Sequence, residues 1–171
     1  LLHSYRQGAL ISGCLDDYAF LVWGLIDLYE AQFDVKYLRA AVDLNRTMIE
    51  HFWDKDEAGL FFSPDDASDL PLREKAFHDG AIPSGNSVAM LNLLRLSHLT
   101  GETQWGEMAW ELARSSAGLL ATQPAGYAML LSSLDYGLGP SMQIALVGRS
   151  EDAAIIEMLS AIRERFLPHK S

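Results

Sequence analysis

The sequence predicts an all-α fold: part of an (α/α)6 toroid with about three helical hairpins, to which a short strand and a C-terminal helix are appended. Segments that are apolar on nearly every face alternate with segments that carry one apolar stripe, and this pattern distinguishes buried helices from half-exposed ones. The alternation then repeats, so that Leu93 aligns with Leu25 and Trp105 with Tyr37. With 49% hydrophobic residues in a chain of 171, such a core can be filled.

The first hairpin is predicted over residues 15–33 and 36–53. Residues 15–33 are apolar all round and too long for a strand, since strands rarely exceed about 10 residues. Asp16 and Asp17 suit the first turn of this helix, where negative charge is favoured. Residues 36–53 carry a single stripe, so we expect this helix to cover its neighbour on one side and to meet water on the other. The stripe consists of Tyr37, Leu38, Ala41, Leu44, Met48 and Phe52.

The second hairpin is predicted over residues 84–99, again apolar all round, and 103–121. Ser84 is a favourable N-cap, because its hydroxyl can accept a hydrogen bond from a backbone N–H of the first turn. Gly101 is typical of the position that follows a helix. A third all-round helix is predicted over residues 124–136, with a proline in its first turn. The stripe of residues 103–121 consists of Trp105, Met108, Ala109, Leu112, Leu119 and Leu120.

Helices that are buried all round fit the inner ring of a toroid, and amphipathic helices fit its outer ring. A linear solenoid would leave both helices of each pair half exposed, which agrees less well with this pattern. We expect residues 1–139 to form the toroid part. Residues 140–171 are predicted to be an appendage of the same domain, with a strand over 142–147 and a helix over 151–166 that has Ser150 as its N-cap.

Composition narrows the classes of partner. The formal net charge of −10 argues against a nucleic-acid surface and against an anionic membrane. Cys14 is the single cysteine, which excludes an internal disulfide and a metal site built from several cysteines, and we expect neither a metal nor another cofactor. No apolar run reaches the roughly 18 residues of a membrane span, and no signal-peptide pattern opens the chain. We therefore expect a cytoplasmic protein and, because the opening LLHSYRQG is not typical of a domain start, a piece of a longer chain.

Four stretches carry a family resemblance: LDDYA at 15–19, LYEAQFD at 28–34, FHDGAIPSGNSVA at 77–89 and ALVG at 145–148. They resemble the C-terminal part of the spermatogenesis-associated protein 20-like family of thioredoxin-domain-containing proteins. The resemblance implies an (α/α)6 toroid of the six-hairpin glycosidase type, like that of N-acylglucosamine 2-epimerases, with a thioredoxin-like domain earlier in full-length members. We transfer no redox chemistry, because the single cysteine is not part of a Cys-x-x-Cys motif. The sequence departs from the family pattern at Ala58, where a second glycine is expected, and at His78, where another polar or aromatic residue is expected.

The candidate site is predicted at one mouth of the toroid, because parallel inner helices place their N-termini at the same end. Free N–H groups at such an end favour an anionic or hydroxyl-rich ligand. Asp17 and Asp79 are the candidate catalytic carboxylates, as base or nucleophile, and His78 is the alternative proton carrier. Carboxyl groups about 5–5.5 Å apart would suit retaining glycoside cleavage, and about 6.5–9.5 Å apart inverting cleavage. The candidate substrate-binding residues are Tyr18, Arg73, Lys75, Ser84 and Asn86.

These residues also have a structural interpretation. Only one of Asp16 and Asp17 can face a central cavity, because adjacent helical residues point about 100° apart. Asp17 and Asp79 would otherwise pair with Arg73 and Lys75 and fix the loop between the hairpins. An aromatic residue on an apolar helix is a core residue more often than a ligand contact.

Different classes of function remain open. The first is a carbohydrate-active enzyme region, epimerase-like or glycosidase-like, acting on a sugar or sugar derivative by analogy of fold. The second is a non-catalytic ligand-binding, structural or regulatory module of a larger thioredoxin-domain-containing protein. Three inner helices cannot close a ring of six, so each end helix keeps an uncovered apolar side. We therefore expect self-association, or contact with a part of the chain that precedes Leu1.

Overall fold

The computed structural model describes residues 1–6, 9–67, 73–149, 151–167 and 169–170. Two short strands, β1 (Leu2–Arg6) and β2 (Ala9–Ser12), form an antiparallel hairpin that the sequence pattern did not predict. The predicted all-α class with a small extended element is confirmed. The helices are α1 (Leu15–Gln32), α2 (Val35–Phe52), α3 (Gly85–Thr100), α4 (Thr103–Thr122), the short 3-10 helix η1 (Pro124–Gly126), α5 (Ala128–Leu138) and α6 (Ala153–Arg163).

The ends of α3 follow from the capping residues that the sequence supplies. The Ser84 hydroxyl accepts a hydrogen bond from the Ser87 N–H at 3.2 Å, which satisfies a donor of the first turn. Gly101 ends the helix in the left-handed conformation, with φ at 77°, where glycine has no Cβ to clash. The helix predicted over residues 124–136 begins later than predicted, because Pro124 opens η1 and the α-helix starts only at Ala128.

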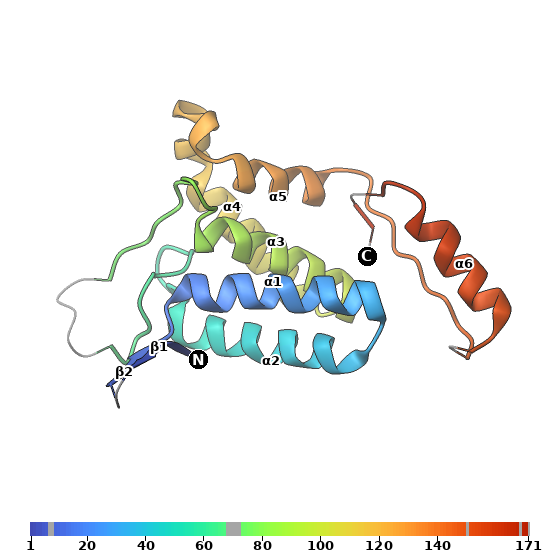
Figure 1. Ribbon diagram of the computed structural model, residues 1–171. Helices are drawn as coiled ribbons and strands as arrows, with labels where there is room; N and C mark the ends of the chain where they lie inside the picture. The colour runs from blue at the N-terminus through green and yellow to red at the C-terminus, as the bar shows by residue number, and fades with distance from the viewer. Residues whose placement is uncertain (7–8, 68–72, 150, 168, 171) are drawn as a thin grey trace.

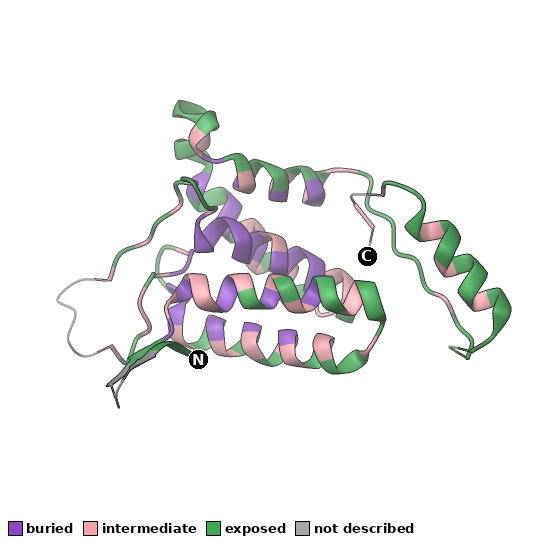
Figure 2. Ribbon diagram, viewed as in Figure 1, coloured by how far each residue is buried: buried purple, intermediate pink, exposed green. Residues whose placement is uncertain are grey.

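Helices α1, α3 and α5 lie side by side and run in the same direction, while α2 packs against α1 and α4 against α3 (Figure 1). The middle helix α3 therefore has neighbours on several sides. It is buried over most of its length (Figure 2), as its apolar sequence predicts. The core contains fully buried side chains from all five of these helices, among them Val22, Met48, Leu93, Leu112 and Leu130.

The prediction that α1 is buried on most sides is wrong for this chain. Leu21 and Leu28 are each 41% exposed, and a Cβ on Gly24 between them would meet no atom within 4 Å. Leu21, Gly24 and Leu28 form an exposed stripe of α1. Helix α1 packs mainly against α2 and α3, and the exposed stripe faces neither of them. On the other end helix, α5, Leu131 and Leu138 are likewise 40% and 74% exposed. The uncovered apolar sides expected of end helices are therefore present.

We expect this chain to self-associate through the exposed stripe of α1, because water is removed from leucine side chains when a second surface covers them. Sedimentation velocity is expected to show a mass that rises with concentration. Replacing Leu21 and Leu28 together with glutamine should shift the chain toward monomer. The matched control is Leu119→Gln, since Leu119 of α4 is 40% exposed, contrary to its place in the predicted apolar stripe. A monomer mass for the unmodified chain at high micromolar concentration would contradict this prediction.

The turn after α2 contains a strained residue. Ala58 has φ at 58° and the following Gly59 has φ at 86°, so both adopt the left-handed conformation. A side chain with a Cβ costs roughly 1–2 kcal/mol there. Ala58 is the position at which the family resemblance leads us to expect a glycine, and the backbone explains that expectation.

Ala58→Gly is expected to raise the free energy of unfolding by about 0.5–1 kcal/mol, because relief of strain exceeds the added flexibility of the unfolded chain. Urea denaturation measures the change. Ala117→Gly, at an exposed position in the interior of α4, is the control and should lower stability by about 1 kcal/mol. Equal losses in the two variants would show that Ala58 is not strained.

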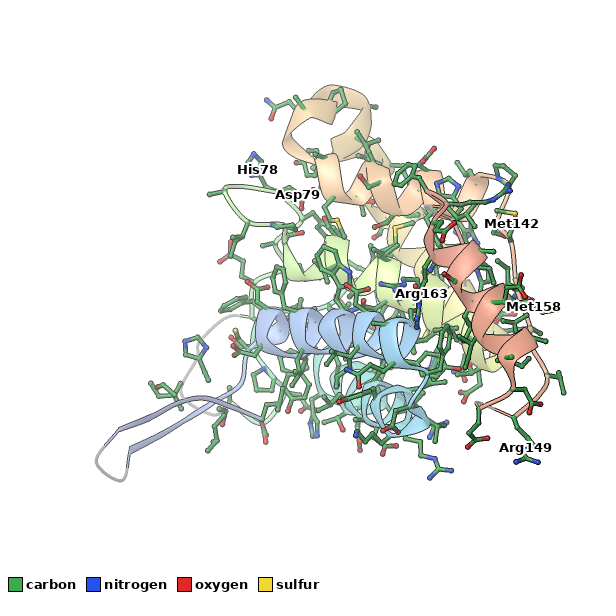
Figure 3. The ribbon with its side chains drawn as sticks, turned by 45° about the vertical axis from the view of Figure 1, so that its right-hand side comes forward. His78, Asp79, Met142, Arg149, Met158 and Arg163 are labelled. Carbon is green, nitrogen blue, oxygen red and sulfur yellow. The ribbon has the colours of Figure 1, made fainter. Side chains whose placement is uncertain are left out.

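The segment after α5 is extended but forms no strand over residues 142–147. Only Met142 makes a bridge, which is parallel to Lys170, and its N–H donates to the His169 carbonyl at 3.0 Å. The predicted strand is therefore wrong, because within the described residues no neighbouring strand pairs with the rest of this segment. Helix α6 stands apart from the other helices in Figure 1, and its Arg163, labelled in Figure 3, donates to the Ala31 carbonyl near the end of α1 at 2.7 Å.

Helix α6 is shorter than predicted and more exposed. It begins after Asp152, and the predicted N-cap Ser150 lies outside the described residues. Met158 and Phe166, two apolar residues of the helix predicted over 151–166, are 51% and 91% exposed. Like the other helices that the structure describes, α6 is not long and apolar enough to cross a membrane.

Candidate functional site

The N-terminal ends of α1, α3 and α5 lie at the same end of the molecule (Figure 1), and Asp79 joins two of them. Its Oδ1 atom accepts a hydrogen bond from the Ser84 N–H at 2.9 Å. Its Oδ2 atom accepts from the Met129 N–H at 2.8 Å and from the Leu130 N–H at 3.3 Å. One carboxylate from the loop before α3 thus caps both α3 and α5, where the positive ends of the helix dipoles favour negative charge.

Asp16 is the α1 carboxylate that faces α3. A Cβ on Gly85 would stand 2.4 Å from Asp16 Oδ1 and 2.7 Å from Leu15 Cγ, so only glycine lets the two helix ends approach this closely. Burial raises the pKa of Asp16 above its ordinary value; a hydrogen bond from the Gly85 backbone opposes this shift, and the charge of Asp17 adds to it. The sequence allowed one of the two adjacent aspartates to face inward, and the rotation of α1 selects Asp16, which the predicted site omits.

Asp17 turns toward the β1–β2 hairpin instead. Its Oδ2 atom accepts from the Cys14 N–H at 2.8 Å and lies 2.9 Å from His3 Nδ1. Burial acts to raise the pKa of Asp17, but hydrogen bonds from Cys14 and His3 outweigh it and hold the pKa below its ordinary value. The two predicted catalytic carboxylates, Asp17 and Asp79, therefore bind different partners in different elements.

Ser84 and Asn86 are engaged with the protein's own backbone. The Asn86 amide nitrogen donates to the Leu60 carbonyl at 2.8 Å and the Ala76 carbonyl at 2.9 Å, and its oxygen accepts from the Leu60 N–H at 2.8 Å. The Ser84 hydroxyl contacts the Phe77 carbonyl at 3.1 Å. Asn86 is fully buried, so it connects two loops to the start of α3 and offers no group to a ligand.

Arg73 and Lys75 stand over the ring of Phe61, 4.2 Å and 5.3 Å from its centre. Arg73 donates to the Ser63 carbonyl through Nε at 3.0 Å and through Nη2 at 2.8 Å. The Lys75 ammonium lies 2.6 Å from Asp54 Oδ2. Among the described contacts neither cation pairs with a predicted catalytic carboxylate, so the expected structural pairing is also wrong. Both cations instead hold the loop after α2 against the loop before α3.

His78 and Tyr18 have contrasting surroundings. His78 is exposed on the loop before α3, next to Asp79 (Figure 3), and its ring meets the edge of Tyr127 with 5.8 Å between ring centres. Tyr18 is only 7% exposed, and its ring packs on Phe52 at 5.3 Å. Tyr18 is therefore a core residue, whereas His78 is accessible.

Comparison with known proteins places this chain in a family. No family model matches the sequence. Spermatogenesis-associated protein 20 is 35% identical to the chain in rat and mouse and 33% identical in human, in each case over 159 residues, or 92% of the chain. The chain belongs to the spermatogenesis-associated protein 20 family.

The chain spans about a fifth, 20%, of the length of these relatives. A Caenorhabditis elegans protein is 31% identical over 156 residues, which are 91% of the chain and 21% of that protein. The resemblance seen in the sequence to the C-terminal part of the spermatogenesis-associated protein 20 family is thus confirmed. The relatives' names state no ligand and no reaction.

In this member of the spermatogenesis-associated protein 20 family, backbone N–H groups that we expected to be free at the start of α3 already donate hydrogen bonds within the chain. The Ser84 N–H donates to Asp79 Oδ1 and the Ser87 N–H donates to the Ser84 hydroxyl, while the Asp16 carboxylate lies beside Gly85. Two carboxylates already meet the positive ends of the helices, so an anionic ligand is disfavoured there. The groups that this end offers to a ligand are hydrogen-bond acceptors.

The Lys75–Asp54 pair is expected to give this spermatogenesis-associated protein 20 region an acid-sensitive step. The hydrogen bond from Lys75, with others from the backbone of Asp56 and Glu57, holds the pKa of Asp54 below its ordinary value. A carboxyl whose pKa is lower in the folded state stabilises the fold above its unfolded pKa. That stability is lost as the pH falls through the folded pKa.

Urea midpoints measured from about pH 7 down to about pH 3 should therefore fall less steeply for Asp54→Asn than for the unmodified chain. Asp43→Asn, at an exposed position of α2, is the control and should leave the slope unchanged. If Asp54→Asn had the same slope as the unmodified chain, the pair would contribute no pH-dependent stability.

Proposed function

We propose that this region of the spermatogenesis-associated protein 20 family binds a neutral, hydroxyl-rich ligand, a sugar or sugar derivative, at the N-terminal ends of α1, α3 and α5. The observation that carries the proposal is the Asp16 carboxylate, which lies partly exposed beside Gly85 at the start of α3. Among the described residues no basic side chain pairs with it. A carboxylate with free lone pairs accepts hydrogen bonds from sugar hydroxyl groups.

The arrangement of the helices supports a sugar as the class of ligand. Three parallel inner helices with two helices behind them correspond to about half of the (α/α)6 toroid that the family resemblance implies. Because the relatives are much longer than this chain, their remaining helices would complete the mouth opposite Asp16. The choice of sugars rests on analogy with six-hairpin glycosidases and epimerases.

If the site is catalytic, Asp16 and His78 are the side chains that we propose as proton acceptor and donor. Asp79 accepts three backbone hydrogen bonds, so it positions helices and does not act on the substrate. Epimerisation beside a carbonyl requires a proton acceptor and a donor on opposite faces of the sugar, and an imidazole can serve in either role. Glycoside cleavage would require a second carboxyl group near Asp16, which in this proposal comes from the longer protein.

A second candidate function is a structural module without ligand chemistry. One observation favours it: Arg73, Lys75, Ser84 and Asn86, four predicted binding residues, all bind backbone atoms or side chains of the chain itself. In this alternative the polar groups before α3 stabilise an irregular loop, and the mouth stays empty.

Isothermal titration of the chain with a panel of neutral and anionic sugars tests the proposal. We expect saturable binding of a neutral sugar, weakened more than about tenfold by Asp16→Asn and unchanged by the exposed control Asp43→Asn. Polarimetry and a reducing-end assay on the bound sugar then separate an epimerase or glycosidase from a non-catalytic binding module. Absence of binding to any sugar, or equal binding by Asp16→Asn, would overturn the proposal in favour of the structural module.

A further inference from the structure

A second cluster of functional side chains lies at the other side of the α1 N-terminus, between the β1–β2 hairpin and the helix. One ligand-type atom from each of His3, Cys14 and Asp17 lies within 4.8 Å of the other two. His3 Nδ1 is 2.9 Å from Asp17 Oδ2 and 3.1 Å from Oδ1, and Cys14 Sγ is 3.2 Å from Oδ2. The hairpin brings His3 to Cys14, residues that the sequence separates.

The three donor types suit zinc. Zn²⁺ is bound in proteins by thiolate sulfur, imidazole nitrogen and carboxylate oxygen at about 2.0–2.3 Å, so tetrahedral ligand atoms lie about 3.4–3.6 Å apart. The His3–Asp17 and Cys14–Asp17 separations of 2.9 Å and 3.2 Å are slightly shorter than that value, and all three ligand atoms lie within 4.8 Å of one another, so small side-chain rotations would reach it. The combination of one soft sulfur with nitrogen and oxygen disfavours Mg²⁺ and Ca²⁺, which prefer all-oxygen sites.

The backbone holds this cluster in place. Cys14 is the N-cap of α1, and its N–H donates to Asp17 Oδ2 at 2.8 Å. This capping bond can stay intact while Oδ1 binds a metal, which is the way that outer hydrogen bonds orient carboxylate ligands. Cys14 and Asp17 are partly buried and His3 is exposed, so a metal can enter from the His3 side.

We propose that His3, Cys14 and Asp17 form a zinc site with its fourth position open to water. On binding, the Cys14 thiol releases its proton to solvent as the metal–sulfur bond forms. Three protein ligands and one open position are the arrangement of zinc sites that act on a bound water or substrate. The site uses a different side of α1 from Asp16, because adjacent helical residues point about 100° apart, and it shares no ligand residue with the proposed sugar site.

A histidine–aspartate pair elsewhere in the chain provides the matched comparison. His51 Nδ1 lies 2.8 Å from Asp65 Oδ1, as close as the pair at the proposed site, but the only cysteine of the chain is Cys14. The hydrogen bond with Asp65 raises the pKa of His51 above its ordinary value. Without a thiol this pair is expected to remain a simple ion pair.

Titration of the chain with Zn²⁺ alone, followed by calorimetry, and with Co²⁺ alone, followed by absorbance, tests the site. We expect one metal ion per chain and a sulfur-to-cobalt charge-transfer band. Cys14→Ser and His3→Gln should each weaken zinc binding more than about tenfold, as even the loss of an outer partner can, and Cys14→Ser should abolish the cobalt band. His51→Gln should leave affinity and spectrum unchanged.

Cys14→Ser is expected to fold, because serine is a better N-cap than cysteine, so lost binding in this variant reports on the ligand and not on unfolding. Circular dichroism of each variant checks this. The absence of saturable one-to-one binding, or a Cys14→Ser variant that binds zinc like the unmodified chain, would overturn the proposal. A loss of affinity in His51→Gln equal to that in His3→Gln would do so as well.

Discussion

Replacing Asn86 with alanine is expected to lower the free energy of unfolding by roughly 3–4 kcal/mol, the larger of the two greatest effects we expect. The Asn86 side chain is fully buried and makes three hydrogen bonds with the backbone of Leu60 and Ala76, all at 2.8–2.9 Å. Alanine would leave an N–H and two carbonyl groups without their partner. Each unsatisfied buried group costs about 1–3 kcal/mol, and part of this cost is relieved where water can enter.

Chemical denaturation measures the loss, and hydrogen exchange locates it, because the Leu60 N–H should lose its protection. Asn45→Ala is the matched control. Asn45 is also fully buried, but neither its amide nitrogen nor its oxygen has a partner among the described residues. Its removal frees no backbone group and relieves an unpaired amide, so we expect a change within about 1 kcal/mol. Equal losses in the two variants would show that cavity formation, and not hydrogen bonding, sets the cost.

The helices could be predicted from sequence because their burial follows the period of the apolar residues. Ala41, Met48 and Phe52 of α2 are buried as the stripe requires, and α3 is buried all round. The same apolar pattern in α1 predicted burial of Leu21, which is exposed, since burial also depends on whether a neighbouring helix is present. The strand predicted after α5 was also wrong, because a strand requires a partner strand that the local sequence does not specify.

The meeting of the helix N-termini could be predicted from the sequence, but the contacts of the side chains around them could not. The parallel helices α1, α3 and α5 do bring their N-termini to the same end, with Asp79 and Ser84 in contact. Which of Asp16 and Asp17 faces inward depends on the rotation of α1, which the packing of Leu15 against Gly85 sets. The partners of Asn86 and the approach of His3 to Cys14 come from chain segments distant in sequence, and single-sequence patterns do not encode such contacts.

Asp79→Ala is expected to lower the free energy of unfolding by roughly 2–4 kcal/mol, because one side chain caps two helices. Its oxygens accept from Ser84 at the start of α3 and from Met129 and Leu130 at the start of α5. Loss of one N-cap costs about 0.5–2 kcal/mol, and here two are lost together with a favourable charge. Thermal denaturation measures the total. Hydrogen exchange should show lost protection at Met129 and Leu130.

Asp34→Ala is the control for this prediction, since Asp34 caps only α2, by accepting from the Lys36 N–H at 3.0 Å, and should cost about 1 kcal/mol. The loss of unfolding free energy in Asp79→Asn should lie between the losses in Asp34→Ala and Asp79→Ala. An amide keeps one acceptor oxygen but turns its NH2 group toward a backbone donor. If Asp79 had a purely catalytic role, the Asp79→Asn protein would lose turnover and keep its melting temperature. The bonded geometry predicts the reverse order of effects, in which stability falls first and any loss of ligand binding follows from the separation of α3 and α5.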